Sequence, residues 1–125
     1  MKLRAAMVLA VTSAIEHTPA VRRAMERQVR VHPLCAWCGT SLHPNCHHIL
    51  PAHLCVLQGK LSLLTDPLNM TTLCRGVAND WAGADNCHWI YGHRRNWSLY
   101  DPNVVSVCWT HRRMIAEHYW RNCHE

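Results

Sequence analysis

The sequence lacks an apolar stretch long enough to cross a membrane. Its most apolar segment near the start, residues 5–14, follows a basic opening and is much shorter than the roughly 20 residues that a membrane-spanning helix needs. Internal repeats and low-complexity tracts are also absent, which excludes the solenoid and array architectures that such repeats indicate. The chain of 125 residues therefore has room for one compact domain and a helical arm.

Acidic residues are scarce, with eight Asp and Glu against 13 Lys and Arg, so the net charge is +5. Such an excess is compatible with a polyanionic partner. The arginines form two groups, before and after the cysteine-rich middle of the chain, which would suit a phosphate backbone on both sides of a reaction centre. Solvated helix faces are the alternative explanation. The candidate DNA contacts are Arg27, Arg30, Arg94 and Arg95.

Two interpretations compete for the N-terminal segment. The basic start and short apolar run of residues 1–14 resemble a signal peptide. Charged residues follow closely and glycine is absent up to residue 31, which favours a helix. Thr18 before Pro19 has the pattern of a helix cap followed by proline at the first helical position. We therefore predict a helical arm over residues 1–33, with a second helix at 19–31.

Eight cysteines offer two ways to stabilise a domain of this size, by disulfides or by a metal ion. A disulfide framework would indicate a secreted protein. The segment Cys35-Ala-Trp-Cys38-Gly39 favours metal, because two thiolates at this spacing can bind one ion. The 11 histidines also exceed what a disulfide scaffold requires. We expect a zinc-binding protein of a reducing compartment, the cytoplasm, and keep the secreted disulfide protein as an alternative.

Cys74 and Cys87 are the best candidates to complete a four-cysteine zinc site with Cys35 and Cys38. The polar loop at 75–86, which contains glycine, can close on itself and bring them together. A site of four thiolates is structural, since it leaves no position open for water. Four cysteines without comparable spacing are interpreted as small buried apolar side chains: Cys46, Cys55, Cys108 and Cys123.

The elements expected around these cysteines indicate an α+β domain. Residues 52–66 show no clean periodicity, and the segments on either side contain β-branched and apolar residues typical of strands. The predicted order is a knuckle at 34–41, a strand at 45–50, a strand at 68–74, a helix at 87–97 and a helix at 104–122.

Histidines and an asparagine are interleaved with the cysteines. His47 and His48 lie in the first expected strand, Asn69 lies at the second, and His88 directly follows Cys87. A lone histidine is more often a surface or core residue than a ligand. This order along the chain favours a metal site with a histidine as general base.

These segments resemble the HNH endonucleases, in particular a phage-associated group of small proteins. Each motif alone is weak, and the four in order are specific; together with a similar tail at 96–104, the match covers residues 35–104. The motifs are Cys35-Ala-Trp-Cys38-Gly39, His47-His48-Ile49-Leu50-Pro51-Ala52-His53, Asp66-Pro67-Leu68-Asn69-Met70-Thr71-Thr72-Leu73-Cys74 and Cys87-His88-Trp89-Ile90-Tyr91-Gly92-His93.

The resemblance implies a ββα-metal finger, two short strands and a helix around one catalytic cation, stapled by the four-cysteine site. The nuclease domain would cover 34–104, followed by a C-terminal helix at 105–125. His48 would be the general base that deprotonates a water. Asn69 would order the loop between the strands and hold the His48 ring, or approach the metal.

The implied cation ligands are His47, which stands where many relatives have an aspartate, and a histidine of the helix. We rank His88 ahead of His93 for that second position. Replacing a carboxylate by an imidazole favours Zn²⁺, Ni²⁺ or Mn²⁺ over Mg²⁺. Adjacent strand residues point to opposite faces, so His47 and His48 require an irregular backbone to serve one cation. His53 is interpreted either as a structural hydrogen-bonding residue or as a phosphate contact.

We therefore expect a metal-dependent DNA endonuclease or nickase, which hydrolyses phosphodiester bonds by means of a cation and a histidine base. The resemblance further implies a bacterial or phage-encoded protein, with phage packaging proteins as partners. The alternative function is a non-catalytic zinc-binding module that docks on nucleic acid or protein. Such a module would need the four cysteines but not the histidines.

Overall fold

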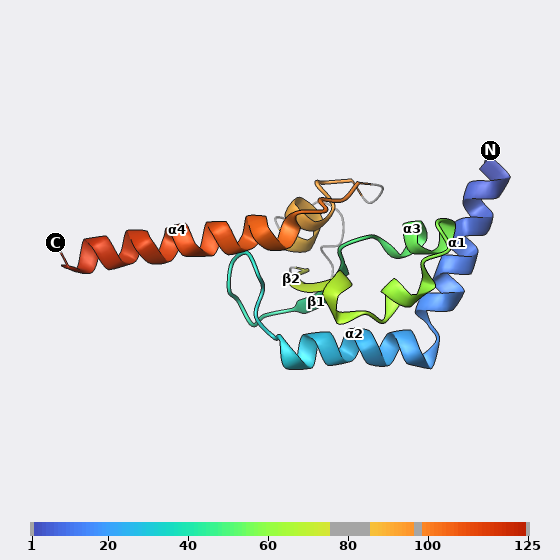
Figure 1. Cartoon of the computed structure of the whole chain (residues 1–125), viewed down its shortest axis with the longest axis horizontal. Coiled ribbons are helices and arrows are strands. Elements are labelled where there is room, and N and C mark those ends of the chain that lie inside the picture. Colours follow the sequence, from blue (N-terminus) through green and yellow to red (C-terminus); the bar gives the residue numbers. More distant parts are fainter. Residues whose placement is uncertain (1, 76–85, 97–98, 125) are drawn as a thin grey trace.

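The computed structural model describes residues 2–75, 86–96 and 99–124 (Figure 1). Four α-helices and a two-stranded sheet make up an α+β fold, as predicted. The helices are α1 (Lys2–Glu16), α2 (Pro19–Val31), α3 (Ala52–Leu57) and α4 (Val104–His124). The strands are β1 (Pro44–His48) and β2 (Met70–Cys74). Short helical turns are η1 (Leu61–Leu64), η2 (Pro67–Asn69) and η3 (His88–Gly92).

The N-terminal segment is helical on both sides of Pro19. Proline at the first position of α2 loses no helical hydrogen bond, because that N–H has no partner within the helix. Thr18 does not cap α2 as expected. Its hydroxyl instead donates to the carbonyl of Ile15 (2.6 Å), at the end of α1. Thr18 therefore joins the two helices at their corner.

The two strands pair antiparallel, with Cys46 opposite Thr72 and His48 opposite Met70. The expected first strand at 45–50 begins and ends earlier, because the backbone of Leu50 is bonded to the Asn69 side chain rather than to a strand partner. α2 packs against this sheet, where Gln28 Nε2 donates to Thr72 Oγ1 (3.2 Å). The sheet thus contacts both α2 and η3, the turn that carries His88.

Two small cores hold these elements together. One consists of Val21, Ala52, Cys55 and Leu64 and joins α2 to α3 and η1. The other is rich in sulfur and joins the sheet to the start of α4; its members are Cys35, Leu73, Cys74, Cys87, Val104 and Cys108. Apolar burial in so small a domain supplies little stability on its own, so the sulfur-rich core is where a metal would contribute most.

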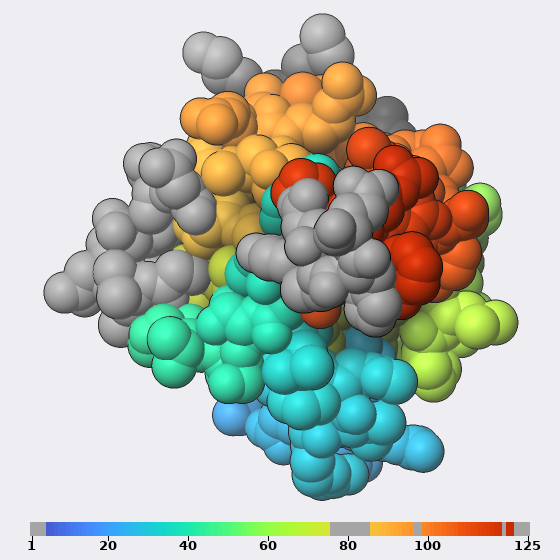
Figure 2. All heavy atoms as spheres, turned by 90° about the vertical axis from the view of Figure 1, so that its left-hand side faces the viewer, coloured from blue at the N-terminus to red at the C-terminus, as the bar shows by residue number. Residues whose placement is uncertain are grey.

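The knuckle segment (residues 34–43) lies between the end of α2 and η3 (Figure 2). Ala36 N donates to Thr72 O (2.8 Å), which fixes the knuckle on β2. Gly39 turns the chain at φ +75°, a left-handed conformation that favours glycine. The ring of Trp37 stacks on both Tyr91 (3.7 Å between centroids) and His111 (3.6 Å). Trp37 therefore clamps α4 to η3.

Beyond this clamp α4 extends away from the body of the protein (Figure 1). The predicted helix at 104–122 is confirmed. Trp109 is exposed on this helix, and the Arg113 guanidinium lies over its ring at 5.6 Å from the centroid. Among the described helices, none is both long and apolar enough to span a membrane. The side chain of Cys123 and residues 76–85, for which a loop was expected, lie outside the described residues.

Candidate functional site

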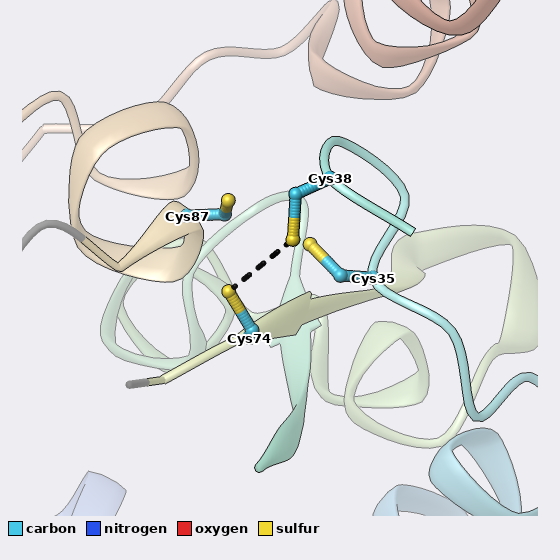
Figure 3. A group of neighbouring side chains, drawn as sticks. All are labelled: Cys35, Cys38, Cys74 and Cys87. Atoms are coloured by element: carbon cyan, nitrogen blue, oxygen red, sulfur yellow. Dashed lines mark hydrogen bonds between the residues drawn. The ribbon is translucent and has the colours of Figure 1, made fainter. Parts of the chain in front are cut away.

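Four cysteines meet at the junction of the knuckle, β2 and η3. The sulfur atoms of Cys35, Cys38, Cys74 and Cys87 point toward one another (Figure 3) and lie within 4.8 Å of one another. Cys38 and Cys74 are 3.8 Å apart, which equals the roughly 3.8 Å edge of a tetrahedron with zinc–sulfur bonds of about 2.3 Å. The predicted cysteine set is therefore brought together, and it can hold a structural metal ion.

The electrostatics of the cluster fit a cation. The pKa of Cys35 is lowered to about 4, chiefly by a hydrogen bond from the Cys87 thiol, and that same bond raises the pKa of Cys87. Burial raises the pKa of Cys38. Four thiols at this distance stabilise one thiolate and hold protons on its neighbours, and a divalent ion replaces those protons with a charge that all four can share.

The remaining described cysteines behave as predicted. Cys46, Cys55 and Cys108 are all buried, and burial raises the pKa of each thiol, to about 12 for Cys46 and about 11 for Cys108. Neutral thiols of this kind are inert apolar side chains.

Three histidines form a second cluster. One ring nitrogen each of His47, His88 and His93 lies within 4.8 Å of the others, and the ring centroids are 4.9–5.0 Å apart. His88 and His93 were expected to be rivals for one ligand position, and the structure brings both to His47.

Both histidines reach His47 because the expected helix at 87–97 is not a regular α-helix. Residues His88–Gly92 form a wider π-type turn, in which His93 N donates to His88 O (3.1 Å). In an α-helix two residues five apart point about 140° away from each other, whereas the i→i+5 bond of a π turn places them one above the other. Such turns are frequent at functional sites.

Burial keeps the three rings neutral. It lowers the pKa of His47 to about 2 and that of His88 to about 3, and the neighbouring imidazoles lower both further. Burial also lowers the pKa of His93, against the hydrogen bond of its Nδ1 to Leu99 O. Metal binding requires neutral imidazole. Both ring nitrogens of His47 are buried without a hydrogen-bond partner among the described residues, and a cation would satisfy one of them.

Gly92 allows the close approach of the rings. A Cβ atom at this position would lie 3.0 Å from His47 Cε1 and 3.0 Å from His88 Cδ2. A side chain there would press on both rings, so glycine at this position leaves them room to approach.

His48 points to a different side from His47, as alternation along a strand requires. Its Nε2 is hydrogen-bonded to the carbonyl of Leu64 (3.0 Å). A carbonyl only accepts, so Nε2 carries the proton and, in the neutral ring, Nδ1 is the acceptor. His48 can therefore lie beside the cluster without binding the same ion.

Asn69 does not hold the His48 ring. Its Oδ1 accepts from Leu50 N (2.8 Å), and its Nδ2 donates to Leu50 O (3.2 Å) and Leu63 O (3.1 Å). The predicted ordering of the loop between the strands agrees with this geometry. Asn69 fixes Leu63, and the next carbonyl, that of Leu64, holds His48. The influence of Asn69 on His48 is thus indirect.

A cavity of about 440 Å³ opens beside the histidines. His48, His88 and His93 line it together with His53, whose ring makes no hydrogen bond to another described residue. The structural hydrogen bond expected for His53 is therefore not found in that part of the chain. Glu16 of α1 also lines the cavity, and no sequence signal pointed to it.

The candidate DNA contacts are distributed over several surfaces. Arg27 and Arg30 are exposed on α2 and line different cavities. Arg94 and Arg95 follow η3 and adopt left-handed backbone conformations, with φ +53° and +62°. All four are accessible to a ligand, and only Arg30 lines a cavity that adjoins the one beside His48.

No known protein family, curated protein or solved structure gives a significant match to this chain.

Proposed function

We propose that the protein is a metal-dependent DNA endonuclease or nickase of the ββα-metal type, with zinc in the four-cysteine site as its structural staple. The observation that carries the proposal is the joint placement of His48 and a three-histidine cluster. His48 lines the same cavity as His88 and His93, and His47 completes the cluster behind them. A general base and a cation site beside one solvent-filled space are the parts that hydrolysis of a phosphodiester needs.

The donor set supports a transition ion at the histidine cluster. Three neutral imidazoles without a carboxylate suit Zn²⁺, Ni²⁺ or Mn²⁺ better than Mg²⁺, which prefers oxygen ligands. Three protein ligands leave a position open for water or a phosphate oxygen, as in catalytic zinc sites. When bound, the cation would polarise the phosphate and stabilise the charge on the leaving oxygen.

His48 would take the proton from the attacking water. With Nε2–H bonded to Leu64 O, the lone pair of Nδ1 is the only basic site of the neutral ring. After the transfer the imidazolium still donates to Leu64 O, so the ring keeps its orientation throughout. Asn69 acts as a positioning residue, because it fixes the segment that presents this carbonyl.

His53 is the nearest candidate for holding the substrate. It lines the cavity and makes no hydrogen bond to another described residue. A ring in this place can donate to a non-bridging phosphate oxygen. This role corresponds to the phosphate contact that the sequence left open.

The test is cleavage of supercoiled plasmid by the purified protein with Mg²⁺, Mn²⁺, Ni²⁺ or Zn²⁺ and with excess EDTA. We expect nicking with the transition ions and none in EDTA. The His47→Ala variant, which removes one cation ligand and leaves the four cysteines intact, is expected to lose nicking while it retains structural zinc. A folded, metal-loaded protein that nicks under no condition would refute the proposal and favour the non-catalytic zinc-binding module.

A further inference from the structure

A second cavity adjoins the one beside the histidines. It has a volume of about 640 Å³, and both cavities are lined by Met25, Asn45 and Cys46. The two cavities therefore adjoin along β1; His48 lines the first and His43 lines the second. We call the two together the β1 groove.

The far end of the β1 groove is basic. Arg30 from α2 and Arg75 from the end of β2 both line it, together with His43. Arg75 N donates to His43 O (3.0 Å), which fixes this corner of the backbone. Glu26 is the acidic residue among the lining residues of this end. Two guanidinium groups from elements far apart in the sequence thus share one pocket, and guanidinium groups bind phosphate oxygens in a bidentate manner.

The length of the groove fits a nucleic-acid strand. Four residue steps separate Pro44 from His48, which in an antiparallel strand amounts to roughly 14 Å. This distance exceeds the spacing of neighbouring phosphates along one DNA strand. A strand whose scissile phosphate lies at His48 would therefore bring a phosphate a few nucleotides away to the two arginines.

We propose that the β1 groove binds the backbone of one DNA strand and that Arg30 and Arg75 hold a phosphate a few nucleotides from the cleaved bond. The inference rests on the proposed nuclease function, which it extends from the reaction centre to the substrate. The contacts are to the backbone, so the groove provides affinity and register but no base sequence specificity.

The test compares two arginines of the same helix. Arg30→Gln removes a charge from the groove, and Arg23→Gln removes the same charge from an exposed position of α2 outside it. Binding of a labelled single-stranded oligonucleotide is measured by fluorescence anisotropy over a range of salt concentrations, with the zinc-loaded protein and no added catalytic ion. Thermal unfolding checks that both variants fold.

We expect Arg30→Gln to weaken binding about tenfold and to lower the slope of log K against log salt by about 0.7, the value for one lost phosphate contact on a single strand. Arg23→Gln is expected to change the affinity less than threefold. Equal losses in both variants would show diffuse electrostatic attraction and overturn the proposal, as would the absence of loss in Arg30→Gln or equal competition by an acidic peptide.

A second measurement separates the groove from the nuclease itself. Oligonucleotides shortened stepwise on either side of the cleavage site should lose cleavage on one side only, once the phosphate that contacts Arg30 is removed. The loss should be absent in Arg30→Gln. Cleavage without this length dependence would overturn the groove and leave the nuclease intact. Arg30-dependent binding without cleavage would refute the proposed nuclease function and leave the proposed DNA binding by the groove standing.

Discussion

Gly92→Ala is the perturbation for which the structure allows the most detailed prediction. The new methyl group would lie 3.0 Å from a carbon of His47 and from a carbon of His88. Carbon atoms pack best at about 3.5–4.0 Å, so each ring has to give by a few tenths of an ångström. Both rings belong to the three-histidine cluster, and the cluster would open by a comparable amount.

Two opposing terms decide the effect on stability. Overpacking of this kind costs about 1–3 kcal/mol, while alanine in a helical turn is favoured over glycine by about 1 kcal/mol. We therefore expect the free energy of unfolding to fall by no more than about 2 kcal/mol. Affinity for the cation should fall far more, by about 10–100-fold, the range seen when the surroundings of metal ligands are disturbed.

The assay is competition for Zn²⁺ or Ni²⁺ at the histidine cluster, with the four-cysteine site already filled. Gly59→Ala is the matched control: Gly59 has φ +68° and no atom within 4 Å of the added carbon, so it incurs backbone strain of about 1–2 kcal/mol without touching a histidine. Normal cation affinity in folded Gly92→Ala, or an equal loss in both variants, would refute the reasoning.

Three further predictions concern the cysteines, the pH and the turn after His93. Cys38→Ser changes an exposed side chain yet should remove the structural ion and most of the stability, while Cys46→Ala should keep one equivalent of zinc. The zinc content of both variants is measured by metal analysis, and retained zinc in Cys38→Ser would contradict the prediction. Without a cation at the cluster, acid should destabilise the fold, because His47 and His88 have pKa values near 2 and 3, below the roughly 6.5 of an unfolded histidine. The unfolded state then binds more protons below pH 6.5, so the free energy of unfolding falls by up to about 1.4 kcal/mol per pH unit for each residue. Urea unfolding between pH 7 and pH 5 measures this, and a free energy of unfolding that does not change with pH would contradict it. Arg95→Gly should raise the free energy of unfolding by about 1 kcal/mol, because glycine adopts the left-handed conformation of this residue without strain. A fall in the free energy of unfolding by that amount would contradict the presence of backbone strain at Arg95.

Metal ligands could be predicted best from the sequence where their spacing alone indicates a site. Cys35 and Cys38 are three residues apart, and their knuckle could be predicted from the sequence. Cys74 and Cys87 could be added because each borders an expected element, and the structure brings all four together. The α+β class and the helices at both ends also follow from composition, proline and glycine.

The histidine cluster was predicted only in part, for a physical reason. His47, His88 and His93 were all candidates, but α-helical geometry makes His88 and His93 alternatives. The π turn that unites them depends on the packing of Gly92 against the His47 ring, a tertiary contact that periodicity does not reveal. Arg75 and Glu16 were missed for a similar reason, since neither belongs to a motif and only the fold places them on the cavities.

Partners of a functional residue are harder still to predict when they are backbone atoms. The sequence suggested Asn69 as the group that orients His48, because an amide side chain is a suitable donor and acceptor. The structure gives that task to the carbonyl of Leu64, an atom that every residue has. Asn69 acts one step away, on the neighbouring carbonyl.

The central claim is that His48 is the general base beside a cation held by three histidines. The most direct measurement is plasmid nicking by His48→Ala, loaded with the same ions as the parent protein and confirmed to be folded. His32→Ala, which removes an exposed histidine, serves as the control. We predict that nicking falls by about 10²–10⁴-fold in His48→Ala and is unchanged in His32→Ala. Undiminished nicking by folded, fully loaded His48→Ala would contradict the claim.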